Sequence, residues 1–432
     1  MADFPAPGYR LNEARTVEPE PEGRQCILRL VVSPTGTISL DMLRFLTSGE
    51  SHGFGLVVVL EGLPAGISFS TKDLANELAR RRLGFGRGPR MAIEEDRVRI
   101  VGGLRHGKTL GSPFSVLIEN SEFAEKWAET MSPDPGEVSG ALTRPRPGHA
   151  DLGGMIKYGF EDARNVLERS SARETAARVA AGAICKAFLE AVGVRVLSHV
   201  LEVGGVRADV DIPHPDDLEA IDKDPLRCLD SRASQDMAAA IEAAREEGDT
   251  VGGVFEVVAY GLPVGLGSYV HWDRRLDCRL AGALMSINAV KAVEIGEGIA
   301  QARSRGSQAH DEIVWGDSEK LFIERKTNRA GGIEGGMTTG EPLVVRGAMK
   351  PLSSLARPLA TIDLATGKPA EAITQRTDTC AVPAAAVVGE AMVSFVLADA
   401  ILEKFGGDTL GEIQERIRAY EARLKRRLDS LP

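Results

Sequence analysis

Short apolar runs of strand length begin the patterned part of the chain. The runs 43–47 and 55–60 are rich in large apolar and β-branched side chains. Gly62 and Pro64 follow the second run, as expected where a strand ends in a turn. The pattern therefore predicts two strands joined by a loop that holds several glycines.

Longer apolar runs predict helices. The segment 169–189 is rich in alanine and poor in aromatic residues, a composition that permits close packing of helices. The stretch 381–402 is the longest apolar one, but Glu390 and Asp399 interrupt it, which is typical of a buried helix rather than a membrane span. The segment 411–428 is amphipathic and predicts a tail helix.

Three pairs of segments resemble one another in the same order along the chain. Their shared patterns are a strand that ends in Gly-Leu-Pro-x-Gly, a Gly-Gly turn before an apolar strand, and an arginine before a long small-residue helix. The pairs are 57–67 with 255–267, 102–116 with 331–345, and 169–189 with 376–397. Three matches in one order predict two related halves.

The two halves span about residues 42–200 and 251–405. Neither alternates strand and helix as a Rossmann sheet does. We therefore expect an α+β fold, a β-α-β sandwich of two quasi-repeated halves with long helices packed between antiparallel sheets. Residues 203–233, rich in Pro and Asp, are expected to link the halves. Residues 1–41 are expected to be a poorly ordered extension to a single domain that covers 42–432.

Composition and charge narrow the class of protein. With 62 acidic and 52 basic side chains, the net charge of −10 argues against a general nucleic-acid or membrane-surface binder. The five cysteines are scattered without a C-x-x-C motif, which suits a reducing compartment and offers no zinc site. No secretory signal is recognisable at the N-terminus, so we expect a cytoplasmic protein.

Two motifs imitate known catalytic loops. The sequence Gly49-Glu50-Ser51-His52-Gly53 matches the nucleophile elbow of serine hydrolases, but that elbow needs a helix after it, and a strand is predicted here. The segment 102–109 matches a phosphate-binding P-loop, which also needs a following helix. A strand is predicted there too, and Met337 replaces Lys108 in the repeated copy. A small-molecule kinase remains the alternative interpretation.

Arginines and a predicted helix start indicate an anion site. Ser171 and Glu174 have the spacing of a capping box, and Arg169 and Arg173 flank it. Further arginines gather at Gly-rich loops; they are Arg80, Arg81, Arg82, Arg87, Arg90, Arg144 and Arg146. In an acidic protein this clustering favours small ligands that carry phosphate or carboxylate groups, although a solvated basic face is the other interpretation.

Two histidines lie in Gly-rich turns beside these arginines. His52 and His149 are therefore candidates for proton transfer near neutral pH. No H-x-H, H-E-x-x-H or clustered Cys/His pattern favours a metal site.

Several long motifs resemble those of the chorismate synthase family. The resemblance runs from Met42 to about Gly407, and its motifs include GESHG, RRRLGFGRGPRM, RPGHADLGGMIKYGFEDARNVLERSSARETAARVAAG, MSINAVKAVEIGEG, NRAGGIEGGMTTGEP and QRTDTCAVPAAAVVGEAM. It implies a lyase that eliminates phosphate and a ring proton from 5-enolpyruvylshikimate 3-phosphate to give chorismate, in the shikimate pathway. It also implies dependence on reduced FMN, and a homotetramer that binds neither nucleic acid nor membrane.

The resemblance assigns roles to particular residues. His52 corresponds to the acid that protonates the departing phosphate, His149 to the residue that stabilises anionic reduced flavin, and Asp378 to the residue that removes the ring proton together with flavin N5. FMN is expected against Arg169, Ser170, Ser171, Asn288, Ala289, Gly335, Lys350, Pro351, Leu352, Ser353, Ser354 and Arg376. The substrate is expected against Ser51, Arg81, Arg87 and Arg173. No NAD(P)H-binding module is recognisable, so NADPH is expected, if at all, as an external reductant.

Overall fold

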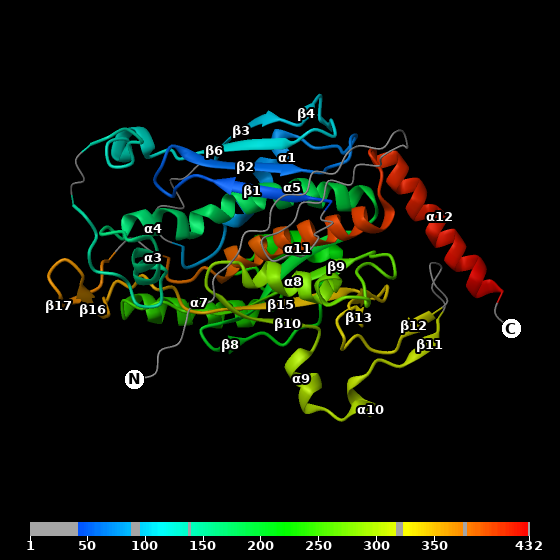
Figure 1. Cartoon of the computed structure of the whole chain (residues 1–432). Coiled ribbons are helices and arrows are strands. Elements are labelled where there is room, and N and C mark those ends of the chain that lie inside the picture. Colours follow the sequence, from blue (N-terminus) through cyan, green and yellow to red (C-terminus); the bar gives the residue numbers. More distant parts are fainter. Residues whose placement is uncertain (1–41, 88–95, 137–139, 317–322, 375–377, 431–432) are drawn as a thin grey trace, which may run out of the picture. The chain divides into compact units, whose positions relative to one another are not determined.

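Two antiparallel sheets enclose a pair of long helices in the computed structural model (Figure 1). The strand order is β1-β2-β6-β3 in the first sheet and β10-β15-β9-β7-β8 in the second. The strands are β1 (Arg44–Ser48), β2 (Gly55–Glu61), β3 (Arg97–Gly102) and β6 (Phe114–Glu119), then β7 (Arg195–Val203), β8 (Val206–Arg207), β9 (Gly253–Tyr260), β10 (Val290–Ile295) and β15 (Leu343–Met349). The expected α+β sandwich is confirmed.

The structure describes residues 42–87, 96–136, 140–316, 323–374 and 378–430. The described residues belong to one compact unit. The expected extension over residues 1–41 lies outside them, as do Arg90 and Arg376.

The two central helices are α5 (Thr175–Ala191) and α11 (Val382–Phe405). A Cβ atom at Gly182 of α5 would collide with Ala391 of α11, so the two helices can approach this closely only because residue 182 is glycine. Among the described helices, α11 is the one long and apolar enough to cross a membrane, yet 94% of its most apolar window is buried inside the protein. It is the buried helix that the sequence pattern predicted.

The two halves share one strand topology, but their boundary differs from the expected one. In the second sheet, β7-β9-β15-β10 repeats the order β1-β2-β6-β3 of the first sheet. The second half therefore begins with β7, whereas the sequence comparison placed it from residue 251 and left β7 in the first half. Residues 203–233 are consequently not a linker between halves, because they lie between β7 and β9 of the same sheet and contain β8.

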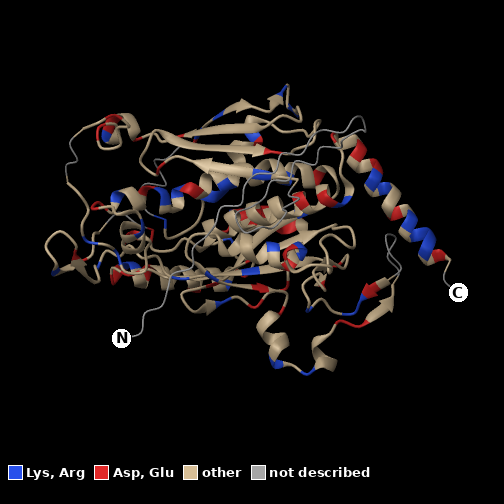
Figure 2. Ribbon diagram, in the orientation of Figure 1, with Lys and Arg blue, Asp and Glu red and all other residues tan. Residues whose placement is uncertain are grey.

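The remaining helices and hairpins surround this sandwich. The helices are α1 (Thr71–Arg82), α3 (Asp151–Tyr158), α4 (Arg164–Ser170), α6 (Leu218–Lys223), α7 (Ser231–Glu246), α8 (Leu276–Met285), α9 (Gly298–Arg303), α10 (Gly306–Ala309) and α12 (Leu410–Asp429). The short hairpins are β4 (Leu104–Arg105) with β5 (Lys108–Thr109), β11 (Ile313–Trp315) with β12 (Ile323–Arg325), β13 (Ile333–Glu334) with β14 (Met337–Thr338), and β16 (Ala360–Asp363) with β17 (Lys368–Glu371). Basic and acidic side chains alternate along α12, the predicted tail helix (Figure 2).

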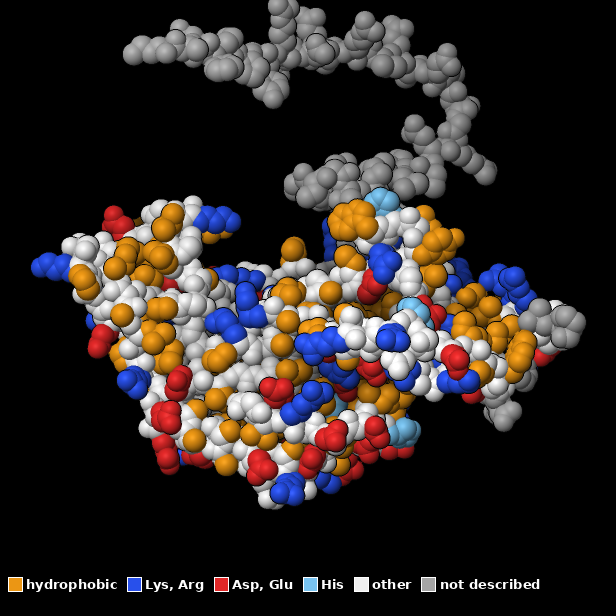
Figure 3. Space-filling view, turned by 90° about the horizontal axis from the view of Figure 1, so that it is seen from below, with side chains coloured by type: hydrophobic (Ala, Val, Ile, Leu, Met, Phe, Trp, Pro, Cys, Tyr) orange, Lys and Arg blue, Asp and Glu red, His pale blue; other side chains and the backbone are white. Residues whose placement is uncertain are grey.

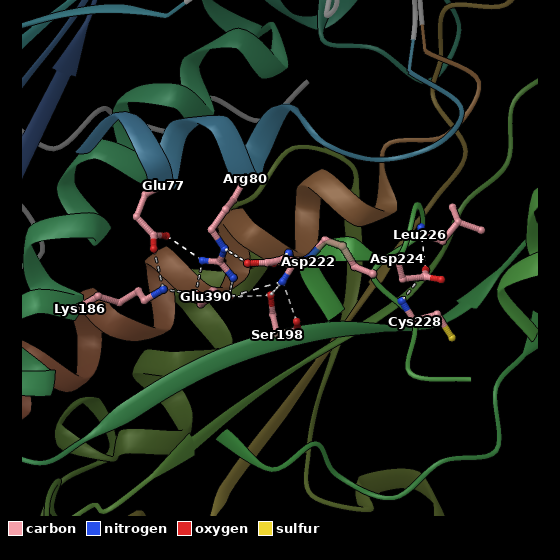
Figure 4. Close-up of polar contacts among 10 residues, drawn as sticks. Glu77, Arg80, Lys186, Ser198, Asp222, Asp224, Leu226, Cys228 and Glu390 are labelled. Atoms are coloured by element: carbon pink, nitrogen blue, oxygen red, sulfur yellow. Dashed lines mark hydrogen bonds and ion pairs between the residues drawn. The ribbon is translucent and has the colours of Figure 1, made fainter. Parts of the chain in front are cut away.

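A buried network of charges ties α1 to both central helices (Figure 4). Glu390 of α11 accepts hydrogen bonds from Arg80 Nη1 at 2.7 Å and Nη2 at 3.1 Å, and also from Lys186 of α5. Arg80 in turn lies 2.8 Å from both Glu77 and Asp222. Charges of both signs are thus paired inside the core, which is the condition under which buried ions are tolerated.

Candidate active site

A cavity of about 590 Å³ collects most of the residues selected from the sequence. Of those, the following line it: Ser51, His52, Arg81, Arg87, His149, Ser170, Ser171, Arg173, Asn288, Ala289, Lys350, Leu352, Ser353, Ser354 and Asp378. They come from both halves of the chain. The fold therefore gathers the expected acid–base, flavin and substrate residues at one place.

A few expected residues lie elsewhere. Arg169 is half-exposed, and its guanidinium donates hydrogen bonds to backbone oxygens at and just after the end of β1, at 2.9 and 3.2 Å. It supports the loop after β1 and does not line the cavity. Pro351 and Gly335 do not line it either; Gly335 lies in the turn between β13 and β14. Arg376 is outside the described residues.

The loop that carries Ser51 and His52 connects β1 directly to β2. This strand–loop–strand arrangement confirms that the motif is not a nucleophile elbow. Gly49 has φ = 98°, and a Cβ atom there would collide with the backbone oxygen of Gly55, so glycine is required. Asn120 Nδ2 donates to the backbone oxygen of Gly53 at 2.7 Å and fixes the loop from the side of the sheet.

His52 is held from two sides. Its Nδ1 lies 2.9 Å from Glu168 Oε1, and the Glu168 side chain is 3% exposed. The indole of Trp127 packs against the imidazole with 4.2 Å between the ring centroids. The guanidinium of Arg164 lies over that indole, 5.4 Å from its centroid. His52 therefore has a restricted orientation at the cavity wall.

His149 has a similar partner. Its Nδ1 lies 2.6 Å from Asp151 Oδ1, and Arg146 Nε donates to Asp151 Oδ2 at 2.8 Å. Burial alone raises the pKa of Asp151, but the hydrogen bonds from His149 and Arg146 outweigh this effect and hold that pKa well below its usual range. Asp151 is therefore a carboxylate at neutral pH and favours a proton on His149 Nδ1.

Guanidinium groups form the anion-binding part of the cavity. Arg173 Nη1 lies 2.5 Å from the buried carboxylate of Asp96, and Arg81 Nη2 lies 3.8 Å from it. Arg87 Nη1 lies 3.0 Å from Asp378. With Arg146, four arginines among the described residues line the cavity, and this arrangement favours a ligand with several negative charges.

The expected capping box forms only in part. The Ser171 hydroxyl accepts a hydrogen bond from the Arg173 backbone N–H and caps a 3₁₀ turn at Ala172–Glu174. Glu174 does not complete the box; its carboxylate instead accepts hydrogen bonds from Thr47 Oγ1 and Arg178 Nε. The 3₁₀ turn leads directly into α5, so the predicted helix start is at the cavity but is less regular than expected.

Further polar groups that line the cavity could hold a cofactor. Asn288 Nδ2 donates to the backbone oxygen of Ser170 at 2.9 Å, while the buried Asn288 Oδ1 has no hydrogen-bond partner among the described residues. Ser354 Oγ accepts from Arg146 Nη1 at 2.7 Å. Burial, followed by the charge of Lys291, lowers the pKa of Lys350. In the part of the chain that the structure describes, no group of three or more His, Cys, Asp or Glu could hold a metal ion.

Sequence reasoning missed part of the lining. The unassigned residues include Trp127, Arg146, Leu167, Ile287, Met349, Ala384, Ala385 and Val388. Arg146 was noted within the arginine cluster but not placed at the site. Trp127 belongs to a π-helical turn, Phe123–Trp127, whose surroundings have no motif.

The P-loop-like segment is a tight hairpin that is followed by a strand. β4 and β5 pair through Leu104–Thr109 and Arg105–Lys108, and His106 has φ = 49° in the turn. Lys108 Nζ donates to Ser68 Oγ, and β6 follows. Because β6 and not a helix follows this hairpin, the kinase alternative has no support.

Comparisons with known proteins agree with this geometry. The family model of chorismate synthase matches residues 43–402. A chorismate synthase of Saccharopolyspora erythraea is 57% identical over 398 residues, covering 90% of this chain and 99% of the relative. One of Salinispora tropica is 59% identical over 389 residues, covering 88% and 98%. A solved crystal structure of chorismate synthase has a TM-score of 0.72 and 42% identity, covering 90% of this chain and all of the other. The chain therefore belongs to the chorismate synthase family.

Proposed function

We propose that the described cavity is where this chain eliminates phosphate and a ring proton from 5-enolpyruvylshikimate 3-phosphate to form chorismate. The observation that carries the proposal is the meeting of two carboxylate-bonded histidines with four arginines in one cavity. The substrate has one phosphate and two carboxylates, and guanidinium groups bind both kinds of anion. Arg81, Arg87 and Arg173 bind these anions, and Ser51 completes their site.

The chain's own groups supply the proton transfers. His52 gives a proton to the departing phosphate, because a phosphate leaves more easily when its charge is reduced. Asp378 provides the carboxylate for removal of the ring proton, and its contact with Arg87 Nη1 fixes its position at the cavity wall. His149, whose Nδ1 is bonded to the Asp151 carboxylate, stabilises the anionic form of the reduced flavin.

The same cavity fits a reduced FMN cofactor. The unpartnered Asn288 Oδ1 can accept a hydrogen bond from a ligand N–H or O–H group. Ser170, Ser353 and Ser354 offer further polar contacts, and Lys350 offers a positive one. When bound, reduced FMN supplies an electron to the reacting substrate and recovers it, so that no net oxidation occurs. We propose an external source of reduction, such as NADPH acting through another protein.

The quaternary state and location form part of the proposal. The outer face of the first sheet exposes Leu46, 77% accessible, beside its cross-strand partner Val59 and the neighbouring Val57. Exposed apolar patches of this kind are typical of protein interfaces and favour self-association into a homotetramer.

Acidic and basic side chains are interspersed on the face in Figure 3. Together with the net charge of −10, this favours a cytoplasmic enzyme of small molecules.

An anaerobic assay tests the proposed function. The protein is incubated with 5-enolpyruvylshikimate 3-phosphate, with and without dithionite-reduced FMN, and phosphate and chorismate are both measured. We expect equal amounts of the two products, and only when reduced FMN is present. Phosphate release that requires ATP, or no release at all, would contradict the proposal.

A further inference from the structure

We infer that Glu168 is a positioning residue that sets the protonation and orientation of His52, an inference that rests on the proposed function. Glu168 belongs to α4 and does not line the cavity. It is 116 residues from His52 in the chain, and no motif singled it out. Its effect on the reaction is exerted through His52.

Both carboxylate oxygens of Glu168 are engaged by the same residue. Oε1 lies 2.9 Å from His52 Nδ1, and Oε2 accepts the backbone N–H of His52 at 2.8 Å. An ionised carboxylate can only accept hydrogen bonds, so Nδ1 must carry the proton. Nε2 is then the ring nitrogen that exchanges a proton with a ligand in the cavity.

Other contacts hold this pair in place. The Glu168 backbone oxygen accepts the backbone N–H of Ser51 at 2.9 Å, so Glu168 binds the loop as well as the ring. Arg164 Nη1 lies 3.5 Å from Glu168 Oε1 while its guanidinium lies over Trp127. Trp127 packs on the imidazole face. The ring is thereby held by its edge and by one face, as a proton donor to a fixed leaving group must be.

The negative charge of Glu168 also stabilises the protonated form of His52. Once His52 has a proton on both nitrogens, the buried carboxylate compensates the positive charge at about hydrogen-bond distance. A glutamine cannot replace it, because an amide has one acceptor oxygen and the carboxylate accepts at both. Glu168→Gln therefore removes the charge and leaves one of the two His52 donors facing an NH₂ group.

The test is a double-mutant cycle with reduced FMN under anaerobic conditions. We expect Glu168→Gln to lower kcat roughly 10- to 100-fold, the range for a carboxylate that supports a functional histidine, with KM for the substrate and Kd for FMN little changed. In a His52→Ala background the same substitution is expected to cause no further loss. The matched control is Glu256→Gln, which alters another buried carboxylate that bonds a histidine, His199, and does not line the cavity, and which should leave kcat unchanged.

Two results would overturn the inference: an unchanged kcat in Glu168→Gln, or an equal fall with and without His52, which would indicate a general structural role. A readout independent of turnover separates this inference from the proposed function. Ring ¹⁵N NMR of the folded wild type, at a pH where the His52 ring is neutral, should show the proton on Nδ1. A proton on Nε2 alone would overturn the inference, whereas an inactive wild type with Nδ1–H would overturn only the proposed reaction.

Discussion

His149 Nδ1 lies 2.6 Å from Asp151 Oδ1, and the Asp151 side chain is fully buried. Arg146 binds the same carboxylate through Nε and Nη2. The cavity thus has two histidines, each with a buried carboxylate at Nδ1, because Glu168 holds His52 in the same way. Both rings are thus oriented by a carboxylate at the same nitrogen.

The first prediction concerns Asp151→Asn. The depressed pKa of Asp151 in the folded protein contributes stability above the unfolded value of about 3.9, and this contribution is lost as the pH falls below it. The variant should therefore melt below the wild type at pH 7, and the difference in Tm should shrink between pH 5 and pH 3. Thermal unfolding across this range is the measurement. A difference that stays constant to the lowest pH would contradict the assigned carboxylate pairing.

A second prediction concerns the buried charge network. Glu390→Gln removes the negative charge shared by Arg80 and Lys186, and breaking a buried pair in this way typically costs about 3–5 kcal/mol. Urea unfolding measures the change in free energy. The control is Glu219→Gln, since the exposed Glu219–Lys223 pair should contribute nothing measurable. Equal effects of the two substitutions would show that the network does not stabilise the core.

The third prediction concerns the P-loop-like hairpin. Lys108→Ala should leave turnover nearly intact, because Lys108 is exposed, donates to Ser68 and does not line the cavity. Calorimetry should detect no ATP binding to the wild type. Micromolar ATP binding that the substitution abolishes would restore the kinase interpretation.

The fourth prediction concerns the N-terminal segment. The family match begins at residue 43, and residues 1–41 carry none of its motifs. A chain that starts at Met42 should keep the Tm and the turnover of the full-length protein. A large decrease of either quantity would show that the segment belongs to the folded domain.

The sequence predicted the elements whose pattern follows from their burial. α11 is buried all round, so its apolar run stood out. β2 was predicted from its β-branched residues and from Gly62 and Pro64 after it, and its buried and exposed residues alternate as in a sheet with one covered face. Burial also explains why β7 was not recognised as the first strand of the second half. Nearly all of its residues are buried, so it lacks the alternation of β1 and shows no likeness to it.

Site residues could be predicted where one short motif contains them. They could not be predicted where residues distant in the sequence come together in the fold. Ser51 and His52 lie in one Gly-rich loop, and their place in the cavity followed from that loop. Glu168 and Trp127 contact His52 from separate segments, and nothing in their own neighbourhoods marks this contact. Arg169 as a flavin contact stays a prediction, and the fold directs its guanidinium to the end of β1.

The proposed reaction depends most on His52 as the acid for the departing phosphate. General acid–base residues typically contribute ~10²–10⁴-fold, or roughly 3–5 kcal/mol of barrier. The most direct measurement is rapid-quench phosphate release in a single anaerobic turnover, for wild type and His52→Ala, at saturating substrate and reduced FMN, with both affinities measured separately. We predict a loss of that size in the rate of phosphate release with affinities nearly unchanged. A near-normal rate at saturation, with weakened binding alone, would show that His52 positions the substrate and does not protonate it.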